Sequence, residues 1–189
     1  MAGPIASYNG IDLLLSALEQ LPHELPIEID IAGTGSRTER LLAIASRDER
    51  LKLHGLLDLD SLFALYQKAD VILTLRITKS LDTCTWFPSK FLEALVCGRC
   101  VLTTNVAHLQ AEYGKYCVVL DDETPEALAS AMKRLVDMGS VNRDAIGRAA
   151  REYMLSAHTW EAQSRRIVSY CDKIIQGELY KYEGMVKIR

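Results

Sequence analysis

The sequence contains no long hydrophobic run and has few proline, glycine or aromatic residues. Its longest apolar stretches, such as Val71 to Leu75, have strand length, whereas a membrane helix needs about 20 apolar residues. Only 5 prolines and 11 glycines among 189 residues exclude a collagen-like chain, and the 49% of hydrophobic residues exclude a disordered one. The first ten residues lack the charged and apolar segments of a signal peptide. We therefore expect a globular protein whose length suits one domain.

Neither sign of charge is in excess. Twenty-two basic and 25 acidic residues give a net charge of −3, which argues against a nucleic-acid partner. The five cysteines are odd in number and lack framework spacing, so we expect free thiols in a reducing cytoplasm. Cys97 and Cys100 form a C-x-x-C where a helix is expected to end, which favours packing over redox chemistry. The histidines are scattered, so we predict no metal site; they are His23, His54, His108 and His158.

Helical and strand patterns alternate along the chain. The periodicity predicts strands over 26–32, 51–55, 71–75, 101–104 and 116–120. It predicts helices over 9–21, from 36, from about 58, from Pro88 to an end at Gly98, and over 124–138, 142–155 and 160–176. Strands separated by helices form a parallel sheet covered on both faces. We therefore predict an α/β fold, a doubly wound, Rossmann-like parallel sheet in a three-layer αβα sandwich, as a single domain over 1–177 with a tail over 178–189.

Capping residues mark where several of these helices begin. Ser36 and Glu39 have the spacing of a capping box. Thr124 followed by Pro125 predicts a helix start, because proline fits the first helical position. Three further candidate N-caps precede apolar helical patterns; they are Asp58, Asp60 and Thr159.

Ligands of an open parallel sheet bind at the carboxyl ends of its strands, beside helix N-termini. Unpaired N–H groups and the helix dipole favour a phosphate or carboxylate there. The sequence predicts five loops at this edge; they are Gly3–Asn9, Gly33–Ser36, Gly55–Asp58, Arg76–Lys90 and Thr104–His108. Their glycines allow the backbone to approach a ligand closely. Gly33-Thr-Gly35 lacks the third glycine of a dinucleotide fingerprint, which argues against NAD.

The segment after the third predicted strand carries the most informative side chains. Arg76 ends that strand, and the first turn of the next helix contains Pro88, Ser89 and Lys90. Glu93 follows one turn later, where its carboxylate can accept the two vicinal hydroxyls of a ribose. Cations, helix N–H groups and one carboxylate together can hold a nucleotide diphosphate. The alternative is that Lys90 and Glu93 are solvated surface charges, and composition alone favours it.

The run FPSKFLEALVCGRCVLTT resembles the signature segment of family 4-type, GT-B-fold glycosyltransferases (glycosyl transferases group 1). Further landmarks of that family follow in the same order from residue 3 to about 175; they are Asn9-Gly10-Ile-Asp, Ile31-Ala-Gly33-Thr-Gly35, Leu53-His-Gly55, Leu65-Tyr66 before Ala69-Asp70-Val71, and Thr159-Trp160. The resemblance implies the C-terminal, donor-binding one of two Rossmann-like domains, without its N-terminal, acceptor-binding partner.

The resemblance also assigns roles at the site. In the family an E-x7-E pair contacts the donor; its second glutamate corresponds to Glu93, at the ribose, and its first falls on Thr85, at the transferred sugar. An arginine and a lysine that hold the diphosphate correspond to Pro4 and Asn9, and neither carries charge.

A diphosphate needs cationic or N–H partners to offset its desolvation. We hypothesise that Arg76 and Lys90, with the backbone N–H groups of Ser89 and Lys90, replace the two missing charges, and that Lys79 is a weaker candidate. By the same resemblance, Pro88 belongs to the turn beside the donor. Gly33 and Gly35 let the chain pass near the donor, and the backbone around Gly55 and Leu56 faces the base.

The resemblance implies glycosyl transfer from a nucleotide-diphosphate sugar with retention of configuration, without metal or cofactor, in polysaccharide or cell-envelope glycan assembly. It implies a cytoplasmic protein, held at the inner membrane through the absent domain, and a chain that is inactive alone and can form dimers through its uncovered face. Two alternatives stay open: a non-catalytic nucleotide-binding module of the same fold, and an unrelated small-ligand domain with a flavodoxin-like sheet.

Overall fold

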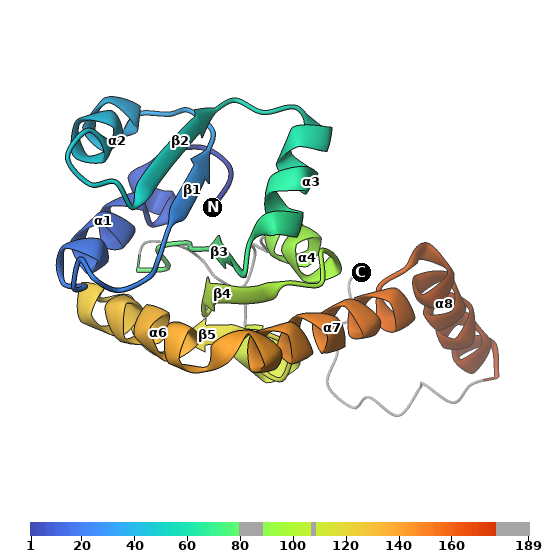
Figure 1. Ribbon diagram of the computed structural model, residues 1–189. Helices are drawn as coiled ribbons and strands as arrows, with labels where there is room; N and C mark the ends of the chain where they lie inside the picture. Colours follow the sequence, from blue (N-terminus) through green and yellow to red (C-terminus); the bar gives the residue numbers. More distant parts are fainter. Residues whose placement is uncertain (80–88, 107–108, 177–189) are drawn as a thin grey trace. The chain divides into compact units, whose positions relative to one another are not determined.

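The computed structural model describes residues 1–79, 89–106 and 109–176 (Figure 1). The chain forms two compact units, Met1–Glu152 and Tyr153–Arg189. Thr85 and Pro88, and the tail that we predict over 178–189, lie outside the described residues.

Helices and strands alternate as predicted. The strands are β1 (Ile29–Ala32), β2 (Leu51–Gly55), β3 (Val71–Thr74), β4 (Cys100–Thr104) and β5 (Val118–Leu120). The helices are a 3-10 turn η1 (Ser7–Asn9), α1 (Ile11–Glu19), α2 (Thr38–Ala45), α3 (Leu59–Lys68), α4 (Ser89–Val96), α5 (Leu109–Tyr113), α6 (Pro125–Asp137), α7 (Gly139–Ala157) and α8 (Trp160–Ile175).

All strand pairs among the described residues are parallel. β1 pairs with β2, and β4 lies between β3 and β5. An isolated bridge from Ala2 to Ala32 places the first residues of the chain along β1, on the side away from β2. Parallel strands joined by helices that flank them confirm the predicted α/β, Rossmann-like fold.

The core of the first unit lies where helices cover the strands. α1 packs against α6, and α4 packs on β3 and β4 (Figure 1). β4 is buried along its whole length, as expected for a strand with neighbours on both edges. Phe91 of α4 is fully buried and meets the ring of Tyr113 edge to face, with centroids 5.3 Å apart. Burial raises the pKa of the Cys100 thiol to about 11, which favours the packing interpretation of the C-x-x-C.

Three predicted helix caps are confirmed. The side chains of Asp58, Thr124 and Thr159 accept hydrogen bonds from the N–H groups of Ser61, Ala127 and Ala162. Each satisfies a donor that the helix itself leaves unpaired.

The predicted capping box of Ser36 and Glu39 is wrong. α2 begins at Thr38 with Arg37 at its N-cap position, and the Thr38 hydroxyl accepts from the N–H of Gly35 at 2.9 Å. Before α2, Gly35 lies against the backbone of Ile5, where a Cβ would stand 2.3 Å from the Ile5 oxygen, and the N–H of Arg37 donates to that oxygen at 3.0 Å. This close approach is a long-range contact that local spacing does not reveal.

A buried arginine closes the end of α1. Arg50 is 9% exposed, and its guanidinium donates to backbone carbonyls at 3.2–3.3 Å; they belong to Leu18, Leu21 and Pro22. Asp48 accepts from the same guanidinium at 2.7 Å. Leu18 lies in the last turn of α1 and Leu21 and Pro22 follow the helix, so Arg50 ties the end of α1 to the turn after it.

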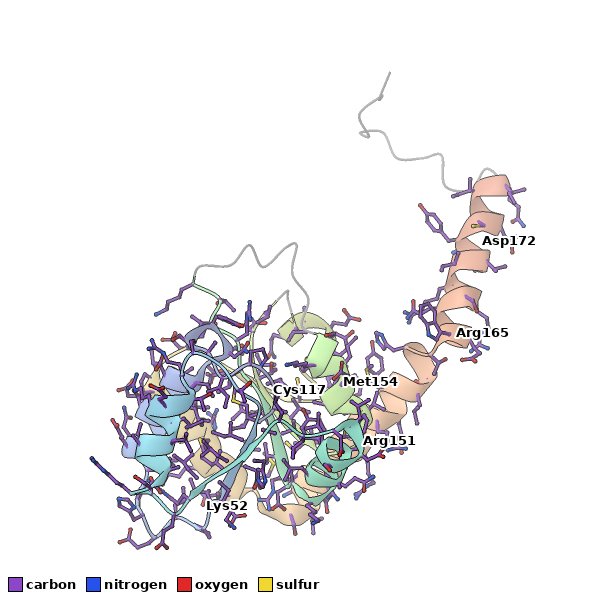
Figure 2. All side chains as sticks on the ribbon, turned by 90° about the horizontal axis from the view of Figure 1, so that it is seen from above. Lys52, Cys117, Arg151, Met154, Arg165 and Asp172 are labelled. Carbon is purple, nitrogen blue, oxygen red and sulfur yellow. The ribbon has the colours of Figure 1, made fainter. Side chains whose placement is uncertain are left out.

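The second unit consists of the last residues of α7 and the whole of α8 among the residues described. Figure 2 shows Arg165 and Asp172 spaced along α8. Most of the large apolar side chains of α8 are exposed; they are Trp160, Ile167, Val168, Tyr170, Ile174 and Ile175. Across the described ranges, no helix has both the length and the apolar character that crossing a membrane requires.

Candidate nucleotide site

Three of the predicted glycine-containing loops meet at the carboxyl ends of β1 and β2. The N–H of Gly33 donates to the oxygen of Gly55 at 2.6 Å, and the N–H of Gly3 donates to the oxygen of Ala32 at 2.9 Å. Gly33 has φ +136°, and a Cβ there would stand 1.9 Å from the Gly3 oxygen. The backbones touch, so only glycine fits at position 33. Leu56, the next predicted contact of the base, is 78% exposed beside them.

Arg76 lies at the centre of this edge, just after β3. Its Nη1 donates to Oδ1 of Asn9 at 2.9 Å, and its guanidinium lies 4.4 Å from the ring centroid of Tyr8. Asn9 is itself oriented, because its Nδ2 donates to the Pro4 oxygen at 2.7 Å. The backbone N–H of Arg76 donates to the Thr104 hydroxyl at 2.9 Å. These contacts hold one positive charge at Asn9, where the family places a lysine.

Lys90 brings a second positive charge to the same loop. It lies in the first turn of α4 and is exposed, and its Nζ stands 2.1 Å from the position that a Cβ of Gly3 would take. Gly3 precedes Pro4, where the family places an arginine. The two cations that we predict for the diphosphate therefore reach both ends of the segment from Gly3 to Asn9.

A carboxylate fixes the loop that carries Arg76. Both oxygens of Glu123, after β5, accept from the N–H of Thr78, at 2.9 and 3.0 Å. The N–H of Ile77 donates to the Tyr8 oxygen at 3.0 Å. Lys79, the weaker candidate, is exposed at the end of this stretch.

Glu93 is exposed on α4, one turn after Lys90. Burial, and to a lesser degree the nearby Cys97 thiol and Glu93 carboxylate, raise the pKa of Tyr66 in α3 to about 12. No described side chain covers Glu93, and its carboxylate is accessible to a ligand's hydroxyl groups. Ser89 and Lys90 begin α4, so their N–H groups are among those that a helix leaves unpaired.

Several side chains of this edge are not evident from sequence patterns. Arg37 donates through Nε to the Ser7 hydroxyl at 2.8 Å and lies 3.2 Å from Oδ2 of Asp12. Tyr8 supplies the ring below Arg76, and Glu123 fixes Thr78. The one local signal for Arg37 is its place directly after the loop Gly33–Ser36. Tyr8 and Arg76 are far apart in the sequence, as are Glu123 and Thr78, so no local pattern indicates these two contacts.

Within the described part of the chain, no three histidine, cysteine, aspartate or glutamate side chains gather as a metal site would require.

The comparisons with known proteins show the family and the fold of the chain. The family model described as "Glycosyl transferases group 1" matches residues 1–138. The chain belongs to this family. The match includes β1–β5 and every described residue of the candidate site. A search of curated protein sequences found no match.

Solved structures similar to this group 1 glycosyltransferase chain share its fold. HepE from Anabaena, in complex with UDP, has 16% identity and a TM-score of 0.68 over 90% of this chain and 47% of its own. Sucrose-phosphate synthase from Thermosynechococcus elongatus has 20% identity and a TM-score of 0.69 over 93% and 44%. WaaG, a glycosyltransferase of lipopolysaccharide biosynthesis, has 23% identity and a TM-score of 0.65 over 93% and 45%. The chain spans less than half the length of these proteins.

Proposed function

We propose that the chain is the donor-binding part of a retaining glycosyltransferase and holds a nucleotide-diphosphate sugar at the edge formed by the loops after β1, β2 and β3. The observation that carries the proposal is the convergence of Arg76 and Lys90 on the segment from Gly3 to Asn9. The UDP and UDP-glucose complexes of HepE support a nucleotide sugar as the ligand class.

The proposed chemistry follows from the charge of the leaving group. When the glycosyl bond breaks, negative charge develops on the diphosphate, and fixed cations stabilise it without reorganisation. Arg76 is oriented in advance by Tyr8 and Asn9, so little side-chain entropy is lost on binding. Lys90 and the first N–H groups of α4 complete the positive side of the site. Glu93 binds the ribose hydroxyls, and Thr85 contacts the transferred sugar.

The finer parts of the proposal concern the whole enzyme. HepE and sucrose-phosphate synthase are about twice as long as this chain, which supports an acceptor-binding domain as the partner that catalysis requires. By itself the chain binds donor but does not turn it over. We further propose cytoplasmic polysaccharide or cell-envelope glycan assembly, which the role of WaaG supports.

A non-catalytic nucleotide-binding module is the second candidate. Neutral residues stand at Pro4 and Asn9, and a hydroxyl stands at Thr85 in place of a carboxylate. Both candidates bind nucleotide, and they differ only in transfer. Measuring glycosyl transfer by the chain joined to an acceptor domain separates them, because the module would bind the donor and release no nucleotide.

Calorimetric titration of the 189-residue chain with UDP, GDP and ADP, with FMN as the control, tests nucleotide binding. We expect one of the three diphosphates to bind with a dissociation constant in the micromolar to low millimolar range and FMN not to bind. Binding of FMN alone would favour the flavodoxin-like alternative, and binding of none of the four would refute the proposal.

A further inference from the structure

The second unit contains an open groove of about 540 Å³, lined by the end of α7 and by one face of α8. Three cationic side chains of α8 line it; they are Arg165, Arg166 and Lys173. Ser156 and Ser169 add hydroxyl groups to the lining. Among the described residues, no acidic side chain lines the groove. We call it the basic groove.

Helical spacing explains why these side chains meet. Ala162, Arg166, Ser169 and Lys173 follow one another along α8 at intervals of three or four residues. Side chains at these intervals are neighbours on a helix. Ala162 is buried, so a small side chain lies beneath two long cationic ones and a hydroxyl group.

The exposed apolar side chains of α8 lie on a different face. Trp160, Ile167 and Ile174 recur every seven residues, a spacing that keeps side chains aligned along a helix. Ile167 follows Arg166 directly and Ile174 follows Lys173, and successive residues project about 100° apart. A partner that covers the apolar face therefore does not have to cover the basic groove.

Arg166 and Lys173 carry charges that no carboxylate of α8 offsets. Neither has an acidic residue three or four positions away, where a helical ion pair would form. Arg165 has one, Glu161. Hydrogen bonds from its own backbone N–H and from Thr159, and then the Arg165 charge, lower the pKa of the Glu161 carboxyl, so Glu161 is engaged at the start of α8.

The ion pairs of the two units differ in the same way. In the first unit, the exposed side chains of Arg37 and Arg40 both pair with Asp12. Within the described ranges, none of the three cations of the basic groove forms an ion pair. Residues 153–189 contain six of the 22 basic residues and four of the 25 acidic ones, so the second unit has a basic excess although the net charge is −3. Such a local excess attracts anions.

The chemistry of the basic groove suits a phosphate group. A guanidinium donates through a planar fork that matches two phosphate oxygens, and an ammonium group adds a point charge. Serine hydroxyls can donate to the remaining oxygens. The groove volume is many times the roughly 30 Å³ of a water molecule, so a phosphate fits together with the group to which it is attached. The ring of Tyr170, also in the lining, offers that group an apolar contact.

We propose that the basic groove binds the phosphate group of an anionic ligand through Arg166 and Lys173, with Arg165 and the two serine hydroxyls as further donors. A soluble phosphate compound and the headgroup of an anionic phospholipid both supply this chemistry. The groove belongs to the second unit and the candidate nucleotide site to the first. The inference therefore goes beyond donor binding and does not depend on it.

Two titrations of the full 189-residue chain test the two sources. Inorganic pyrophosphate is titrated while the amide NMR shifts of residues 153–176 are followed, with sodium chloride of equal ionic strength as the reference. Sedimentation with phosphatidylcholine vesicles, with and without phosphatidylglycerol, tests the lipid source.

A pair of double variants identifies the residues responsible. Arg166→Gln with Lys173→Gln removes the two unpaired charges from the groove. Lys133→Gln with Arg148→Gln removes the same two kinds of charge from exposed positions of α6 and α7 outside the groove, and is the matched control. The affinity for nucleotide diphosphate is measured on each variant in parallel.

We expect pyrophosphate, phosphatidylglycerol vesicles or both to bind wild type, and the affinity to fall about fivefold or more in the groove variant and less than about twofold in the control. The titration that shows this difference identifies the source of the phosphate. Nucleotide affinity should be unchanged in both variants, which separates this result from the outcome at the donor site. Absence of groove binding in both titrations, shifts that chloride reproduces, or an equal loss in the control would overturn the proposal.

Discussion

At the scale of single residues, the candidate site depends on where two positive charges are held. Arg76 is fixed by a ring, an amide oxygen and its own backbone, whereas Lys90 is exposed and reaches Gly3 by its length alone. A guanidinium that is already oriented loses less entropy on binding than a flexible ammonium group. We therefore assign the larger share of diphosphate binding to Arg76.

Tyr8 acts through Arg76, and its substitution isolates that effect. Tyr8→Leu removes the ring below the guanidinium, and a cation–π contact contributes about 0.5–2 kcal/mol. We expect nucleotide affinity to fall about 2–30-fold, measured by calorimetry. Tyr8→Phe keeps the ring and serves as the control. A loss of the same size in Tyr8→Phe would contradict a role for the ring.

Asp48 couples the stability of the α1 terminus to pH. The hydrogen bonds from Arg50 hold the pKa of the Asp48 carboxyl below its ordinary value of 3.8. A depressed pKa stabilises the folded state above the ordinary value, and this stabilisation is lost as the pH falls toward the folded-state pKa.

Asp48→Asn should therefore lower the free energy of unfolding by about 1–3 kcal/mol at pH 6. The difference from wild type should shrink as the pH falls from about 3.8 toward the folded-state pKa, because the unfolded wild-type chain then binds a proton that the folded chain does not. Urea unfolding between pH 6 and pH 3 measures this. A difference that stays constant over the whole range would count against the Asp48–Arg50 interaction.

At the scale of elements, the contact of Gly33 with Gly3 determines how closely the first two loops approach. Gly33→Ala forces a side chain into a positive φ and against the Gly3 oxygen. We expect a loss of more than about 3 kcal/mol in the free energy of unfolding. Gly139→Ala is the matched control, because φ is +76° there and no atom lies within 4 Å of the added Cβ. It should cost about 1–2 kcal/mol. Equal costs would refute the steric argument.

The helix caps give a further prediction. Thr124→Ala removes the acceptor of the Ala127 N–H at the start of α6 and should cost about 1 kcal/mol. Ser36→Ala should cost less than about 0.5 kcal/mol, because Ser36 is exposed and does not occupy the N-cap position of α2. Thermal unfolding of the two variants compares them. A larger loss of stability in Ser36→Ala than in Thr124→Ala would support the predicted capping box instead.

The sequence predicts the elements that local chemistry determines. Thr124, Thr159 and Asp58 are recognised as caps because donor and acceptor lie three residues apart. The order of helices and strands, and with it the parallel sheet, follows from periodicity in the same way. Contacts between residues that are far apart in the sequence cannot be predicted from local patterns. Arg76 and Asn9 are 67 positions apart, and no local spacing indicates that a guanidinium meets an amide oxygen there.

At the scale of the whole molecule, the chain matches one part of several longer glycosyltransferase structures. It spans less than half of the similar glycosyltransferases, although its own site brings together cations, a carboxylate and three loops.

The account's central claim is that Arg76 and Lys90 bind the diphosphate. The most direct measurement uses the diphosphate that binds in the titration, written here as UDP, and its nucleoside, uridine. It compares their affinities for wild type, Arg76→Ala, Lys90→Ala and the control Lys52→Ala, whose side chain pairs with Glu28 away from the site. We predict that UDP affinity falls about tenfold or more in Arg76→Ala and about threefold or more in Lys90→Ala, since charged contacts contribute about 1.5–3 kcal/mol when ordered and less when exposed. Uridine affinity and the Lys52→Ala variant should be unchanged. Unaltered UDP affinity in both site variants, or an equal loss for UDP and uridine, would contradict the claim.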